Sequence, residues 1–118
     1  MIMLLRWIAR IGGLVALVLG IMISRSPVLR LHMAIGLLVA VSLGILAIWA
    51  VAARVRIPAA LAGVIWAIGT VRVGLMQTQW MPGEHHWVVQ AAHAILGIGA
   101  IGFAEMLAAG LTKRSSPA

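Results

Sequence analysis

The chain has 118 residues, of which 64% are hydrophobic and only 9% are charged. A soluble domain of this size is usually about one quarter charged, so the composition excludes a water-soluble globular protein. The net charge of +7 comes from single or paired cations without interleaved aromatic residues, which favours basic anchors at lipid headgroups over nucleic-acid binding. The sequence has no cysteine, which excludes disulfides, thiolate metal sites, iron–sulfur clusters and c-type haem attachment.

The first predicted helix covers about residues 4–24. Its two arginines and the following apolar run resemble a signal peptide, but no small-x-small cleavage site follows, so we expect a retained helix. About 20 apolar residues suffice to cross about 30 Å of hydrocarbon. The second helix covers about residues 27–53 and starts at Ser26-Pro27, an N-cap residue followed by proline at the first helical position.

The third predicted helix covers about residues 58–79 and again starts at a proline, Pro58. Trp80-Met81-Pro82-Gly83 separates it from the fourth helix, about residues 84–111. Open sheet edges cannot lie in lipid, so all four spans should be helices, and short connections make neighbouring helices antiparallel. We therefore predict an all-α, up-down-up-down four-helix transmembrane bundle formed by residues 1–118 as one membrane domain.

The cations that flank the spans predict the orientation of the chain. With a cytoplasmic N-terminus, only Arg25 and Arg30 lie outside, and Arg72 lies within the third span. The cations on the inside are then Arg6, Arg10, Arg54, Arg56, Lys113 and Arg114. The positive-inside rule favours this N-in, C-in arrangement. We therefore expect a multi-pass protein of the bacterial inner membrane.

Polar residues inside a membrane are costly and are functional candidates by default. Within the predicted spans these are His32, Arg72, Gln90, His93 and Glu105. A rise of about 1.5 Å per residue places His32, Arg72 and His93 about 8, 10 and 13 Å from the periplasmic ends of their helices. These three side chains are therefore predicted at similar depth on three different helices.

The second and fourth helices share a local pattern, His32 with Gly36 and His93 with Gly97. These helices run parallel, so the two imidazoles can face each other, as the two axial ligands of a six-coordinate haem iron do. A glycine four residues after each histidine, on the same face, leaves room for a flat porphyrin. The alternative is that each histidine only makes a hydrogen bond between helices, since this short pattern is common in a chain with 13 glycines.

Further candidates surround this pair. Arg72, with Arg30 or His86 nearer the surface, could pair with haem propionates, and His86 is the replacement ligand if His93 is not one. His86, Gln90 and His93 lie along one face of the helix. They could surround a bound cofactor or form a proton path toward the surface.

The loop between the last two helices permits a second interpretation. Its residues Met76, Met81, His85 and His86 would suit Cu(I), since thioether and imidazole are appropriate ligands. Trp80 and Trp87 are more simply an aromatic belt at the headgroups, which we favour.

Two features of the helices predict packing. Glu105, near the cytoplasmic end of the last helix, is expected to pair with Arg54, Arg56 or Arg10. Small residues recur at close spacing, which lets helix backbones approach in lipid; they are Gly36, Ala40, Gly44, Gly97, Ala100 and Ala104.

The stretches Leu31–Gly36 and His86–Gly97, continuing through Gly102-Phe103-Ala104-Glu105, resemble small bacterial four-helix membrane cytochromes of the cytochrome b561-like type. They also look like a set of uncharacterised small bacterial four-span membrane proteins. The cytochrome resemblance implies b-type haem held by His32 and His93, and exchange of electrons with quinone or a periplasmic redox partner. This sequence departs from two-haem members because no histidine lies near the cytoplasmic face, so one haem is expected.

Other functions stay open at this stage. A cofactor-free accessory subunit of a membrane complex, or a homodimer, would also suit a small chain with glycine-rich helices. A small multidrug exporter is a weaker interpretation, because Glu105 lies at one end of its span and not at mid-membrane. We expect an electron carrier or redox subunit more than a stand-alone enzyme.

Overall fold

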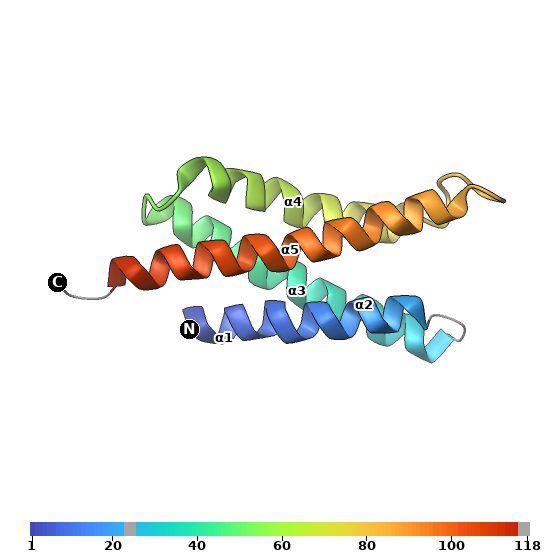
Figure 1. Cartoon of the computed structure of the whole chain (residues 1–118), viewed down its shortest axis with the longest axis horizontal. Coiled ribbons are helices and arrows are strands. Elements are labelled where there is room, and N and C mark those ends of the chain that lie inside the picture. The colour runs from blue at the N-terminus through green and yellow to red at the C-terminus, as the bar shows by residue number, and fades with distance from the viewer. Residues whose placement is uncertain (23–25, 116–118) are drawn as a thin grey trace.

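The structure, a computed structural model, describes residues 1–22 and 26–115 (Figure 1). The first rod consists of α1 (Ile2–Trp7), a π-helical turn η1 (Ile8–Gly12) and α2 (Gly13–Ile21). Three long helices follow: α3 (Ser26–Ala52), α4 (Ile57–Met76) and α5 (His86–Ser115). The prediction of an all-helical chain is confirmed for the described residues, which contain four helical rods long and apolar enough to cross a membrane. Ser24 and Arg25, used to predict the orientation, lie outside the described residues.

The helix ends differ from the predicted ones for local reasons. The last helix continues past Leu111 to Ser115, since the Ser115 hydroxyl donates a hydrogen bond to the Leu111 carbonyl one turn earlier. The third helix stops at Met76 instead of Gln79, where a turn with a hydrogen bond from Gln79 N–H to the Met76 carbonyl begins. The π-helical turn η1 was not predicted.

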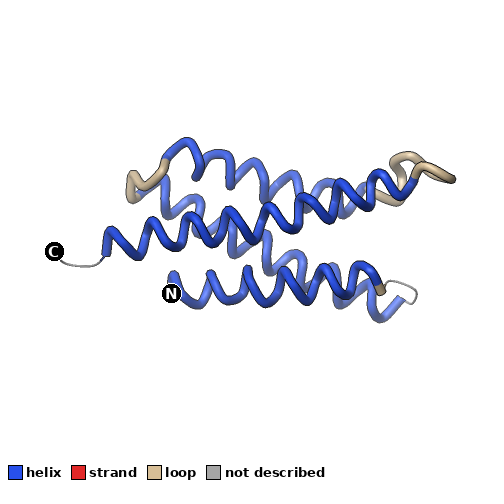
Figure 2. The backbone as a smooth tube through the Cα atoms, viewed as in Figure 1, coloured by secondary structure: helices blue, strands red, loops and turns tan. Residues whose placement is uncertain are grey.

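The helices form a flattened bundle of 56 × 24 × 15 Å (Figure 2). α3 and α5 contact each other and every other helix, whereas α4 and the α1–α2 rod flank them on opposite sides. Within the described part of the chain, α4 and the α1–α2 rod do not touch. The start of α1 and the end of α5 lie at the end of the molecule that holds the α3–α4 turn, and the α4–α5 connection lies at the other end (Figure 1).

Small residues fill the core. Leu43, Leu46 and Leu107 are the largest fully buried side chains, and most of the remaining core positions are alanines. Gly63 on α4 lets Leu107 approach so closely that a Cβ at residue 63 would lie 3.2 Å from the leucine Cδ1. Lipid is as apolar as leucine, so the helices associate mainly through such close packing and not through a hydrophobic driving force.

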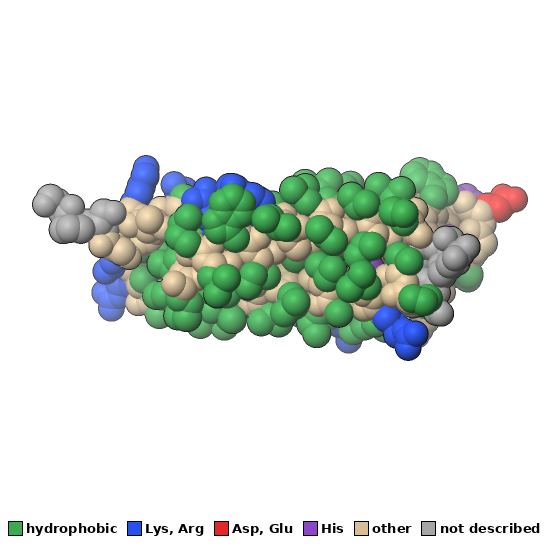
Figure 3. Space-filling model, turned by 90° about the horizontal axis from the view of Figure 1, so that it is seen from below, with side chains coloured by type: hydrophobic (Ala, Val, Ile, Leu, Met, Phe, Trp, Pro, Cys, Tyr) green, Lys and Arg blue, Asp and Glu red, His purple; other side chains and the backbone are tan. Residues whose placement is uncertain are grey.

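The predicted small-residue contacts are partly confirmed. Ala40, Ala100 and Ala104 are buried in the core, as expected. Gly36 and Gly44 do not serve as contact points, because a Cβ on either would have no heavy atom of the described residues within 4 Å beyond its own helix turn. Apolar side chains cover most of the face seen in Figure 3, and the blue cationic groups lie in separate patches along it.

Trp66 fixes α4 against α5. Its indole Nε1–H donates a hydrogen bond of 2.8 Å to the Leu96 carbonyl, and its ring centroid lies 5.3 Å from that of Phe103. A Cβ added to Gly99 would lie 2.4 Å from the Trp66 ring, so only glycine fits beneath the indole.

We predict that Gly99→Ala lowers the thermal unfolding midpoint in detergent, measured by circular dichroism. The hydrogen bond holds the indole in place, so the added methyl overpacks the contact at a cost of about 1–3 kcal/mol. Gly102→Ala is the matched control on the same helix, because nothing of the described residues lies within 4 Å of its Cβ position. An equal loss in both variants would contradict the Trp66 contact.

Candidate functional site

Two histidines from different helices meet inside the bundle. His32 lies on α3 and His93 on α5, the two central helices, and their ring centroids are 6.0 Å apart with an interplanar angle of 69°. The prediction that these two imidazoles share one space, made from their matched depths, is confirmed by this distance. Both side chains are half-buried.

The His32 ring is oriented by the α1–α2 rod. Its Nδ1 lies 2.8 Å from the Ala16 carbonyl oxygen, and since a carbonyl only accepts, this nitrogen carries the proton. Nε2 is then left with a free lone pair, the arrangement that a ligating histidine usually has. Gly20 makes the approach possible, because a Cβ there would lie 3.3 Å from the imidazole Cε1.

The His93 ring packs against α4 and lacks a hydrogen bond on one nitrogen. A Cβ added to Gly74 would lie 2.9 Å from its Cε1 and 3.4 Å from its Nε2. Its Nδ1 is buried and has no hydrogen-bond partner among the described residues. Leaving a buried polar atom unsatisfied costs about 1–3 kcal/mol, and such atoms are explained by a functional role, a bound water or a bound ion.

The separation of the rings fits two ligands of one metal ion. With metal–nitrogen bonds of about 2.0 Å, each ring centroid lies about 3 Å from the metal, so two opposed rings are about 6 Å apart. Within the described residues no cluster of three or more His, Asp or Glu side chains could hold a metal. A tetrahedral zinc site is therefore incomplete here, whereas the donor set fits a haem iron, which takes its other four ligands from the porphyrin.

The glycines that follow the two histidines have different surroundings. A Cβ at Gly36 would meet nothing within 4 Å in the described part of the chain outside its own turn. At Gly97 the nearest atom would be Leu17 Cδ2, at 3.7 Å, an ordinary contact. Neither glycine is needed for helix packing, so their role beside a cofactor stays a prediction.

The predicted cationic partners do not gather at the histidine pair. Arg72 is exposed on α4 and lies two residues from Gly74, about 200° around the helix from the face that contacts His93. Arg30 is exposed at the start of α3. His86 is at the start of α5, with its Nδ1 3.4 Å from the Trp80 carbonyl oxygen. A propionate-binding role for these three residues stays a prediction.

The loop between α4 and α5 is open. Met81, His85 and Trp87 are exposed, and Met76 is half-buried at the end of α4. Gln90 is exposed as well, so the proposed ridge from His86 to His93 passes over an outward-facing side chain. Copper binding by the loop stays a prediction.

A second polar cluster lies towards the other end of the bundle. The Glu105 carboxylate accepts hydrogen bonds from Arg10 Nε at 2.8 Å, Arg10 Nη2 at 2.7 Å and Arg6 Nε at 2.8 Å. The predicted pairing with Arg10 is confirmed, and pairing with Arg54 or Arg56 is wrong. Arg56 instead lies beside Gly110, about 7 Å further along α5. The missed signal was that Arg6 and Arg10 are four residues apart on one helix face.

Sequence reasoning also missed the residues that position the imidazoles. Gly20 and Gly74 form the surfaces against which the two rings lie, and the Ala16 carbonyl orients one of them. Both glycines could have been found by applying the depth argument to the neighbouring helices, since each lies near the end of its span at the depth of a histidine. Comparison with family models, with curated proteins and with solved structures gives no match.

We predict that Gly74→Ala displaces the His93 ring, because the new methyl would lie within 3 Å of its Cε1. The measurement is the ¹⁵N and ¹H chemical shifts of the histidine imidazoles by NMR in detergent micelles. Gly69→Ala on the same helix is the control, since its Cβ position is open among the described residues. His93 shifts that respond equally to both variants would contradict the contact.

Proposed function

We propose that this chain is a single-haem b-type membrane cytochrome that carries electrons near one face of the membrane, with His32 and His93 as axial ligands. The observation that supports it is the meeting of the two imidazoles at a centroid separation of 6.0 Å. The free lone pair on His32 and the unsatisfied nitrogen of His93 support it further.

The protein residues would supply binding and orientation. A bound haem provides a one-electron iron couple, and its potential depends on axial ligands and burial. The Ala16 carbonyl fixes which nitrogen of His32 is free, and Gly20 and Gly74 set the distance of each ring from the neighbouring helix. The surrounding apolar side chains would exclude water.

The proposed orientation places this site on the periplasmic side. We infer an up-down-up-down bundle with both termini in the cytoplasm of a bacterium. Six cations would then face the cytoplasm, as the positive-inside rule favours: Arg6, Arg10, Arg54, Arg56, Lys113 and Arg114. One haem near one face cannot carry electrons across about 30 Å of hydrocarbon. The electron donor and acceptor would therefore meet the protein at the same face, as a quinone or a periplasmic redox protein does.

A cofactor-free accessory subunit is the second candidate. The observation that favours it is the open surface at Gly36 and Gly44, where a Cβ would meet no described atom within 4 Å. Bare backbone of this kind allows a helix of another subunit to approach closely. Native mass spectrometry from mild detergent separates the two proposals, since an accessory subunit should retain a partner chain and lack haem.

The absorption spectrum tests the cytochrome proposal. Protein expressed with added haem and purified in detergent should show a sharp α-band of b type after reduction with dithionite. His32→Ala and His93→Ala should each abolish the band, because one imidazole cannot hold a six-coordinate iron. His85→Ala is the matched control, since His85 is exposed in the α4–α5 loop and should leave the spectrum unchanged.

Circular dichroism must show that both histidine variants remain helical. A colourless wild-type protein, or a band that survives both substitutions, would refute the proposal.

A further inference from the structure

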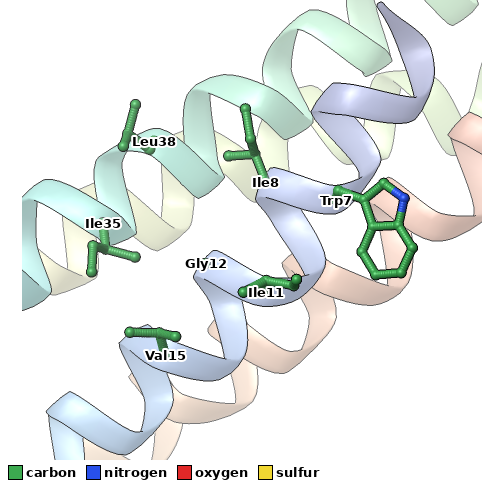
Figure 4. Close-up of a pocket in the computed structure, with 7 residues that line it drawn as sticks. All are labelled: Trp7, Ile8, Ile11, Gly12, Val15, Ile35 and Leu38. Carbon is green, nitrogen blue, oxygen red and sulfur yellow. The ribbon is translucent and has the colours of Figure 1, made fainter.

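An open apolar groove runs along the outside of the bundle, between the first rod and α3 (Figure 4). Its volume is about 440 Å³. Trp7, Ile11 and Val15 line it from the first rod, and Ile35 and Leu38 line it from α3. The groove is an open, apolar surface depression that extends along the first rod from Trp7 to Val15.

A π-helical turn lies along the groove. η1 covers Ile8–Gly12, and π turns inside α-helices are often found at functional sites. At Gly12 a side chain of α3 packs closely against the first rod, since a Cβ there would lie 3.1 Å from Val39 Cγ2. Apolar side chains of the two elements line the groove on either side of this contact (Figure 4).

A net positive charge lies at the Trp7 end of the groove. The Arg10 guanidinium carbon lies 4.9 Å from the centroid of the Trp7 ring, which lines the groove, so the ion cluster adjoins this end of the groove. The cluster contains two cations, Arg6 and Arg10, and one anion, Glu105. The side chains of both arginines are partly exposed, at 29% and 38%, so a ligand can reach their remaining N–H groups.

The cluster lies at a depth that a lipid headgroup can reach. Arg6 is only about 6 Å along the rod from its start at Ile2. α5, with 30 residues, is about 45 Å long and exceeds the hydrocarbon thickness by about 15 Å. Glu105, ten residues before the end of α5, therefore lies close to the headgroup boundary.

We propose that this groove binds one anionic phospholipid, with the phosphate at Arg6 and Arg10 and one acyl chain along Ile11 and Val15. The surplus cation of the cluster selects a negatively charged headgroup, and the indole of Trp7 lies at the boundary between headgroup and chain, where tryptophan is enriched. None of the residues that line this site belongs to the histidine pair, and the site requires no cofactor, so the test of lipid binding is independent of the cytochrome proposal.

Native mass spectrometry in detergent tests the site with two lipids of identical acyl chains, dioleoyl phosphatidylglycerol and dioleoyl phosphatidylcholine. The wild-type protein should retain one phosphatidylglycerol in preference to phosphatidylcholine. Arg10→Gln should weaken phosphatidylglycerol retention by about fivefold, the effect of one cation near the membrane surface. Arg72→Gln, on α4 and away from the groove, should leave it unchanged.

Val15→Trp provides a second test that keeps the ion cluster intact. Val15 is exposed, so a larger side chain can be accommodated and should fill the groove. Retention of phosphatidylglycerol should fall while helicity is preserved. Equal retention of the two lipids by the wild-type protein, unchanged retention in Val15→Trp, or a protein dimer in place of the lipid adduct would overturn the proposal.

Discussion

Hydrocarbon offers no hydrogen bonds, and the need to satisfy polar groups within it determines how this chain is built. Each polar side chain inside the spans has to find a partner on another helix or leave an unpaired atom at considerable cost. Glu105 forms ion pairs with two arginines of the first rod, and Trp66 donates a hydrogen bond to a carbonyl of α5. His32 uses a carbonyl of α2. These contacts give the helices their rotation and register, which apolar packing alone specifies only loosely.

The half-buried His93 side chain lacks a hydrogen-bond partner on one nitrogen among the described residues, and the proposed function depends on this. One nitrogen of its ring is buried without a partner in the described structure, whereas Glu105, Trp66 and His32 each have a partner on another helix. The ring nevertheless lies beside a second imidazole that is already oriented by its own hydrogen bond. One oriented imidazole and one imidazole with an unsatisfied nitrogen, held on the two central helices, are the observations on which the proposed cofactor site depends.

The sequence was sufficient for those properties that depend on distance along a helix. The four helices, and the similar depth of His32 and His93, followed from apolar run lengths and the helical rise. The sequence did not predict which face of each helix points into the bundle. Apolar residues surround every span and leave no polar face to mark the outside. Arg72 therefore seemed to belong with the histidines by depth but lies on the outer face of α4. Glu105 was expected to pair with Arg54, Arg56 or Arg10, and only the contact between the first rod and α5 selects Arg10, with Arg6 one turn away on the same face.

The distribution of the two imidazoles over the chain has a consequence for biogenesis. His32 packs within the first helical hairpin, against Gly20, and His93 packs within the second, against Gly74. Each hairpin can insert into the bilayer with its own half of the pocket already formed. The complete pocket appears only when α3 docks on α5, so a prosthetic group bound there would report that docking is finished and would hold the two hairpins together afterwards.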